Sequence, residues 1–387
     1  LVLGCGGEED EENNQNIFYQ PASPLTPDSF QPGYSDENGN FYFYASKEQT
    51  YYICKSFDVV AEVANEEGRD QALLVESKDG GDNVRQHIIA KSDIFKGFAW
   101  LHPMIDDGFI VSTESKAKSK LRDFLMRFKP SRNITSVKQP GWNGQDYITS
   151  QKSYSAEPAE YLYTGDESPL TSNSSRGTLE GWQNNIARFC LGNPILTLVI
   201  SIAMAAPLLR VFNLAPIAVL LSGVTRTGKT TATTISSSFY RFTGMHAEQG
   251  WELTDSAFEI LCRLASDNLF VLDDITAENC ESIQRKIYRL TNGSSRLTQP
   301  TVCQDRHRLA PLVVLTSGEK SFEKLLLESG SEMPKGLKSR LLDICDWETL
   351  FSELHGFESS GEMAEYLYTA ASEHYGVAGD TYLKALV

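Results

Sequence analysis

One short stretch constrains the fold of this chain more than any other. Residues 223–230, the P-loop, have the sequence G-V-T-R-T-G-K-T, which matches the pattern G-x-x-x-x-G-K-[ST]. In this pattern the glycines allow a tight turn, so that successive backbone N–H groups can bind phosphate oxygens. The apolar run APIAVLLSG leads into the stretch, and TTATTISSSFYRF follows it as a plausible helix. A phosphate-binding loop requires this strand-loop-helix context.

The P-loop predicts a site for ATP and Mg²⁺, with a chance turn of the same composition as the alternative. We expect Lys229 to reach the β- and γ-phosphates and the Thr230 hydroxyl to bind magnesium. The helix that follows should add its positive N-terminal end to the site. The residues expected to contact the nucleotide are Gly223, Val224, Thr225, Arg226, Thr227, Gly228, Lys229, Thr230 and Thr231.

Two later segments add candidate catalytic groups. The apolar run NLFVL is followed by Asp273 and Asp274. Asp273 is the predicted magnesium carboxylate and Asp274 the predicted base that orients the attacking water. A strand ending in two exposed acids is common, so the pair gains its meaning from the P-loop upstream. The next apolar run, APLVVLTSGEKS, ends at Thr316 and Ser317, either of which can hold the attacking water. An ordinary strand end is the alternative there.

A further candidate precedes the short apolar segment LLDI. Arg340 stands in MPKGLKSRLLDIC. An arginine at such a place can stabilise transition-state charge in the site of a neighbouring subunit. A surface salt bridge is the alternative.

Changes of composition along the chain predict five regions. Residues 1–35 are acidic and then Pro/Ser-rich, and are expected to be disordered. Residues 36–165 form a small α+β domain, and 166–177 a linker. Residues 178–350 alternate apolar runs with helical patterns, which predicts an α/β ATPase core with a parallel sheet covered by helices. Residues 351–387 are expected to form a helical lid. The chain starts with Leu, and we expect a longer protein around it.

Composition narrows the cellular setting. The seven cysteines include no C-x-x-C pair, so structural zinc and a disulfide framework are not expected, and a reducing cytoplasm fits best. The most apolar segment, residues 193–212, is interrupted by Pro207 and Arg210, which favours a buried helix over a membrane anchor.

The order of these features resembles that of AAA+-type ATPases, and KSRLLDI is similar to the arginine-finger segment of minichromosome-maintenance-like helicases. The chain as a whole resembles the family catalogued as domain of unknown function 927, described as helicase-like and found in phage and mobile-element replication proteins. The matching stretches cover roughly residues 35–387: QPGWNG, LGNPILTLVISIAMAAPLL, LSGVTRTGKTT, GWELTDSAFE, FVLDDI, RLTNGSSR, VVLTSGEKS, KSRLLDI and LHGFESSGEMAEYLYTAASEHYG.

The resemblance implies an ATP-hydrolysing DNA motor that forms a hexamer-like homo-oligomeric ring on single-stranded DNA. Two positions depart from the pattern. Such motors have Glu as the second acid, where this chain has Asp274, one methylene shorter. The family tends to carry a lysine before the arginine of the segment after Asn-Gly, where this chain has Ser294, Ser295 and Arg296.

Two basic stretches oppose the net charge of −16 and are candidate DNA-binding segments. The first comprises Arg285, Lys286, Arg289, Arg296, Arg306, His307 and Arg308, of which Arg296, Arg306 and Arg308 are the predicted contacts. The second comprises Lys116, Lys118, Lys120, Arg122, Arg127, Lys129 and Arg132. A solvated face is the alternative for each. Trp142 and Trp251 are expected to pack in the core rather than stack on bases.

Two other functions stay open at this point. A P-loop kinase for a small molecule would share the loop and the acids, but would need no arginine from a second subunit. A nucleotide-binding scaffold that no longer hydrolyses ATP would be consistent with the shorter Asp274.

Overall fold

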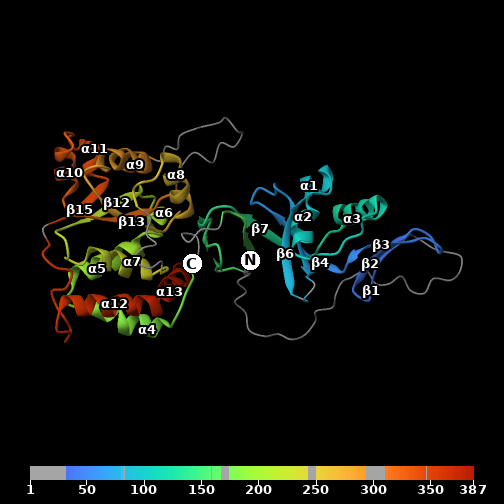
Figure 1. Ribbon diagram of the computed structural model, residues 1–387, viewed down its shortest axis with the longest axis horizontal. Coiled ribbons are helices and arrows are strands. Elements are labelled where there is room, and N and C mark those ends of the chain that lie inside the picture. Colours follow the sequence, from blue (N-terminus) through green and yellow to red (C-terminus); the bar gives the residue numbers. More distant parts are fainter. Residues whose placement is uncertain are drawn as a thin grey trace. The chain divides into compact units, whose positions relative to one another are not determined.

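The computed structural model describes residues 32–79, 81, 83–157, 159–166, 174–242, 250–292, 310–345 and 347–387 (Figure 1). The chain has a mixed α/β structure and divides into two compact units. The smaller unit takes in the described residues up to 136 together with 159–162. The larger unit takes in residues 137–157 and the described residues from 163 to 387.

The smaller unit has two sheets and three helices. One sheet is antiparallel and contains β1 (Gly33–Glu37), β2 (Asn40–Tyr44) and β3 (Thr50–Lys55). The other has the order β11-β7-β4-β5-β6 and contains β4 (Phe57–Ala64), β5 (Ala72–Lys78), β6 (Val84–Ala90), β7 (Asn133–Val137) and β11 (Tyr161–Tyr163). The helices are α1 (Lys91–Lys96), α2 (Leu101–Asp106) and α3 (Ser115–Arg127).

Helix α3 shows why this unit folds as it does. Its apolar residues Leu121, Phe124 and Leu125 recur at helical spacing and are all buried. They pack in one cluster with Phe41, Phe57 and other residues of both sheets. The basic side chains of α3 therefore occupy the remaining faces of the helix.

The larger unit is built around a four-stranded sheet of order β13-β14-β12-β15. All neighbouring strands in it are parallel. The strands are β12 (Ile217–Ser222), β13 (Leu269–Ile275), β14 (Val313–Gly318) and β15 (Leu341–Ile344). A small antiparallel sheet contains β8 (Gly141–Asn143), β9 (Asp146–Ile148) and β10 (Ser153–Tyr154).

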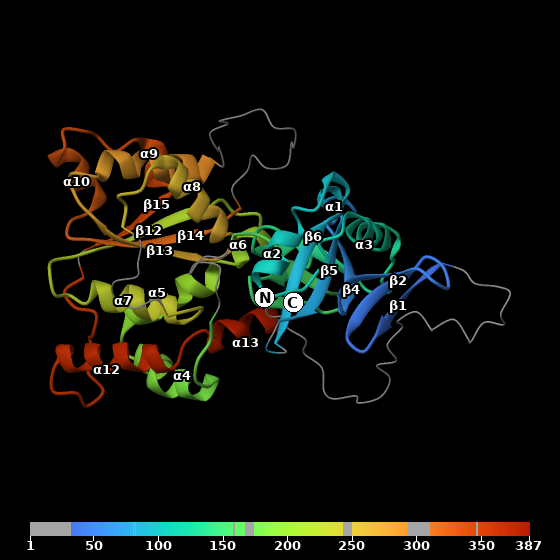
Figure 2. The ribbon, with the colours of Figure 1, turned by 45° about the vertical axis from the view of Figure 1, so that its right-hand side comes forward.

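Helices cover both faces of the parallel sheet (Figure 1, Figure 2). One face is covered by α8 (Asp255–Leu264), α9 (Cys280–Asn292), α10 (Phe322–Glu328) and α11 (Lys335–Lys338). The other is covered by α5 (Pro194–Ala205) and α7 (Lys229–Ser238), beyond which lie α4 (Leu179–Asn185) and α12 (Ser360–Glu373). The remaining elements are the 3₁₀ helix η1 (Ala187–Cys190), α6 (Leu208–Val211) and α13 (Val377–Leu386).

Alternation along β12 explains the two layers. Ala218 and Leu220 belong to the core on the α8–α11 side, and Val219 and Leu221 to the core on the α5–α7 side. Because successive side chains of a strand point to opposite faces, an uninterrupted apolar run is what a strand buried on both faces requires.

The strands and helices predicted from apolar runs around the P-loop are confirmed, but two segments differ from the expected regions. Strand β1 begins at Gly33, inside the segment expected to be disordered. Residues 137–157 pack with the larger unit, whereas composition places them in the small domain. The predicted domain functions stay predictions. No helix in the part of the chain that the structure describes is long and apolar enough to cross a membrane.

Candidate active site

A cavity of about 510 Å³ lies at the carboxyl ends of the parallel strands, where ligands of open α/β sheets bind. Its volume is within the range of small-molecule sites. Most of the predicted site residues line it: Thr225, Arg226, Thr227, Gly228, Lys229, Thr230, Thr231, Asp273, Asp274 and Ser317. The sequence places these groups in three separate segments, and the parallel register of β12, β13 and β14 brings them together.

The P-loop has the tight geometry that its glycines predict. Gly228 has φ +101°, and a Cβ there would lie 2.7 Å from the Cβ of Leu350. The Leu350 N–H also donates to the Thr227 carbonyl at 2.9 Å. Residues just before the C-terminal helices therefore pack directly onto the loop. Gly223 and Val224 do not line the cavity: the Gly223 N–H donates to the Gly318 carbonyl, and Val224 is 70% exposed.

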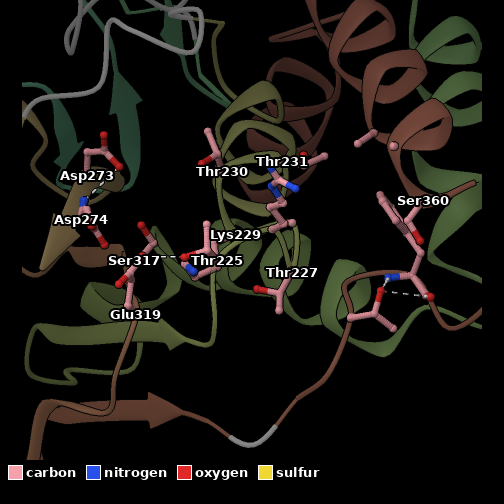
Figure 3. A pocket seen from close by; sticks show the side chains of 16 residues that line it. Thr225, Thr227, Lys229, Thr230, Thr231, Asp273, Asp274, Ser317, Glu319 and Ser360 are labelled. Carbon is pink, nitrogen blue, oxygen red and sulfur yellow. Dashed lines mark hydrogen bonds between the residues drawn. The ribbon is translucent and has the colours of Figure 1, made fainter. Parts of the chain in front are cut away.

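Lys229 begins helix α7 and folds its side chain back over the loop. Its Nζ donates to the carbonyl oxygens of Gly223 at 2.6 Å and Val224 at 3.0 Å. These carbonyls hold the ammonium at the mouth of the loop, beside the exposed Thr230. Figure 3 shows both side chains at the cavity. An anion entering the loop would meet the ammonium and the N-terminal end of α7 together.

The acid pair lies at the end of β13 and faces the P-loop (Figure 3). Both acids are exposed, and the Asp274 N–H donates to Oδ1 of Asp273 at 2.9 Å. Although Asp274 is exposed, the surrounding protein partly desolvates its carboxylate and raises its pKa; the charges of Asp273 and Glu319 raise this pKa further, and Lys229 lowers it. Asp273 and Thr230 offer oxygen atoms, which Mg²⁺ prefers, so the residues present fit a magnesium ion.

The two hydroxyls at the end of β14 have different surroundings. Ser317 lines the cavity. Thr316 is fully buried on the opposite side of the strand, and its Oγ1 accepts a hydrogen bond from Nε1 of Trp251 at 2.9 Å. Of the two candidates, Ser317 is therefore the one placed to contact a ligand. Trp251 is buried in the core on the α8–α11 side, as expected. Trp142 packs half-buried against the core on the α5–α7 side, and its Nε1 donates to the Pro207 carbonyl.

Six cavity residues were not among the sequence candidates. They are Glu319, Thr349, Phe351, Ser360, Gly361 and Ala364. Glu319 follows the strand that ends at Gly318. Its place in the sequence just after Thr316 and Ser317 could have indicated that it lines the same cavity. The others come from the segment after β15 and from the start of α12, which no local pattern links to the P-loop. In Figure 3, Ser360 lies on the side of the loop away from the acids.

Arg340 lies away from this cavity. It immediately precedes β15, and its carbonyl accepts a hydrogen bond from the Ala218 N–H. That is the amino end of β12, whereas the P-loop follows the carboxyl end, roughly 17 Å away along six residues. The guanidinium lies over the ring of Tyr288, 5.1 Å from its centroid. Arg340 is therefore too distant to act on a ligand in the cavity of its own chain.

The basic residues have varied environments. Arg296, Arg306 and Arg308 lie outside the described residues. Lys286 is buried, with its Nζ donating to the Trp251 carbonyl, and burial lowers its pKa. Arg289 pairs with Asp255 at 2.5 Å. On α3 of the smaller unit, the ammonium of Lys120 lies 4.2 Å from the centroid of the Phe43 ring. Lys286 is thus unavailable for DNA contact, whereas Arg285 is exposed.

Comparison with known proteins shows the family of this chain. The profile of the family described as Domain of unknown function (DUF927) matches residues 36–299, which is more than half of the chain. The chain belongs to the DUF927 family. The matched range includes the P-loop and the acid pair, but ends before Ser317 and Arg340. No curated protein sequence matches the chain.

Solved structures also resemble this DUF927 protein. One described as "SCCmec type IV Cch - active helicase" is 17% identical, with a TM-score of 0.68, over 94% of this chain and 66% of that one. At that identity the likeness shows a shared fold. The chain spans just under two thirds of the length of that helicase. The apo structure of the NrS-1 C-terminal region is 12% identical with a TM-score of 0.36, over 84% of this chain and 65% of that one.

Proposed function

We propose that this protein is an ATP-hydrolysing, helicase-like DNA motor of phage or mobile-element replication. The observation that best supports this is the convergence of the P-loop, the acid pair and Ser317 on one cavity. The fold shared with a protein described as an active helicase supports the same proposal. Family membership alone does not name an activity, so the proposal rests on the site.

In the proposed reaction the P-loop backbone and Lys229 bind the phosphates of ATP. Asp273 and Thr230 hold Mg²⁺, which would neutralise charge on the β- and γ-phosphates. Asp274 faces the attacking water, and the hydroxyl of Ser317 can donate a hydrogen bond to the γ-phosphate or to that water. Because Lys229 already sits at the loop, the electrostatic part of the site is organised before the nucleotide arrives.

Arg340 is proposed to act in the cavity of a neighbouring copy within a ring, which we expect to be hexamer-like. Its position at the amino end of the sheet supports this, because the side chain cannot reach the cavity of its own chain. We propose single-stranded DNA as the partner, with Arg296, Arg306 and Arg308 as phosphate contacts. The cytoplasm is the proposed compartment.

The test is steady-state ATP hydrolysis by the wild type, Lys229→Ala and Arg340→Ala, each with and without single-stranded DNA. We expect DNA to stimulate the wild type, and both variants to lose at least about 10³-fold in rate. Lys338→Ala is a matched control, because this lysine lies near Arg340 in sequence but pairs with Glu323 on the surface.

Each alternative predicts a distinct result. Hydrolysis or phosphoryl transfer that ignores DNA and survives Arg340→Ala would favour a small-molecule kinase. ATP binding without turnover would favour a scaffold. Mixing Lys229→Ala with Arg340→Ala subunits sharpens the test, because a site shared between copies regains part of its activity in mixed rings.

A further inference from the structure

Glu319 is the first residue after the central strand β14. It follows Gly318, which pairs with Ser222 at the end of β12 and with Ile275 at the end of β13. Since β14 lies between these two strands, the residue after it emerges between the P-loop and the acid pair. Figure 3 shows the Glu319 side chain beside Ser317 and Thr225, on the same side of the cavity as Asp274.

The contacts of Glu319 leave its carboxylate available. Oε1 accepts a hydrogen bond from the Thr225 hydroxyl at 2.7 Å, and the side chain is exposed to the cavity. In the part of the chain that the structure describes, Glu319 forms no ion pair, and the adjacent Lys320 pairs with Glu328. An ion-pair role therefore does not account for this acid.

Glu319 and Asp274 line the same cavity. Glu319 follows β14 and Asp274 lies at the end of the neighbouring strand β13, so the two carboxylates approach the same region. The side chain of Glu319 is one methylene longer than that of Asp274.

We propose that Glu319 is a second catalytic carboxylate, which holds the attacking water together with Asp274 and accepts its proton. This inference rests on the proposed ATP hydrolysis. In the step, the water oxygen forms a bond to the γ-phosphorus while the bond from that phosphorus to the β,γ-bridging oxygen breaks. The electron pair of the broken bond stays on ADP. The water proton passes to the Glu319 carboxylate and then to solvent, so that the products are ADP, phosphate and one proton.

The variant Glu319→Gln separates this role from a structural one. The amide oxygen of Gln can still accept the Thr225 hydrogen bond at nearly the same length, but an amide cannot accept the proton. A residue that merely braces the P-loop would therefore tolerate the change. Glu323→Gln is the matched control, because Glu323 is an exposed acid four residues later whose carboxylate pairs with Lys338 on the surface.

The experiment measures single-turnover hydrolysis of MgATP with the full chain and single-stranded DNA, and binding of a fluorescent ATP analogue by the same samples. We expect Glu319→Gln to lower the hydrolysis rate at least about 100-fold, as removal of a general base does. Its dissociation constant should stay within about threefold of the wild type. Glu319→Asp should recover part of the rate, and Glu323→Gln should match the wild type.

The outcomes separate this inference from the proposed function. Hydrolysis by Glu319→Gln within about threefold of the wild type would overturn the inference while leaving the motor in place. Equal losses of rate and of nucleotide binding would also overturn it, since they indicate a collapsed loop. A wild type that binds ATP but never hydrolyses it, while Lys229→Ala loses binding, would overturn both proposals.

Discussion

At the carboxyl ends of β12, β13 and β14 polar and charged side chains line a cavity, whereas the carboxylate just before the amino end of β13 is buried and paired. Asp273, Asp274 and Glu319 are among the side chains that line the cavity, and all three are exposed. The buried carboxylate belongs to Asp267, whose side chain is fully buried. The same residue type is thus used in two ways within one sheet.

The amino end is a closed network. Oδ1 of Asp267 accepts from Nε of Arg210 at 2.9 Å, and Oδ2 accepts from the Trp142 N–H at 2.9 Å. The Tyr147 hydroxyl donates to the Asp267 carbonyl. Gly141 permits this approach, because a Cβ there would lie 2.3 Å from Oδ2 of Asp267. Such saturation of a buried carboxylate serves stability, and the unsaturated carboxylates at the other end are free for chemistry.

Among the aspartates at the two ends of β13, Asp274 should show the larger effect on the rate of ATP hydrolysis. Asp274→Asn should lower the rate of ATP hydrolysis by about 10²–10³-fold, because an uncharged amide holds and polarises the attacking water less strongly than a carboxylate does. The melting temperature should stay within about 2 °C of the wild type or rise, since the change removes like-charge repulsion from Asp273. Hydrolysis rates and thermal unfolding of the same preparation check both statements. A variant with full activity would remove Asp274 from the mechanism.

At the amino end of β13, a substitution should lower the stability and leave the rate of hydrolysis unchanged. Asp267→Ala leaves the Trp142 N–H and the Arg210 guanidinium without their buried partner, and we expect a loss of about 2–3 kcal/mol in unfolding free energy. Arg210 is half exposed, so solvent limits the loss. The hydrolysis rate per folded molecule should be unchanged. Denaturant unfolding with active-site titration measures the two separately. A drop in rate without a drop in stability would contradict the division between the two ends.

The sequence predicted most of the residues that line the cavity at the carboxyl ends of the strands. It did not predict the contacts of Asp267 at the amino end of β13. The P-loop and the two acids are continuous motifs, each attached to an apolar strand, so their convergence follows from a parallel sheet. The Asp267 network joins segments more than 100 residues apart, and no local pattern specifies such a contact. The sequence also did not predict that Ser360 and Gly361 line the cavity, because their position depends on how α12 packs on α7.

At the end of β14 the sequence left two candidates open, Thr316 and Ser317. Sequence could not distinguish Thr316 from Ser317, because both are hydroxyls at a strand end. Alternation along the strand separates them, since one faces the core beside Trp251 and the other faces the cavity. The choice depends on register, and a shift by one residue would exchange their roles.

Substitutions of Ser317 and Thr316 should have the smallest effects on rate and stability, and they compare two adjacent residues of one strand. Ser317→Ala should slow ATP hydrolysis by about 10-fold through loss of one hydrogen bond in the cavity, with stability unchanged. Thr316→Val keeps the volume but leaves Nε1 of Trp251 without an acceptor, which should cost about 1–2 kcal/mol in unfolding free energy with little change in rate. Rates and melting temperatures of the two variants, measured side by side, test whether one strand divides chemistry from stability between adjacent residues. If Thr316→Val proved the slower enzyme and Ser317→Ala the less stable protein, the register assigned to the end of β14 would be wrong.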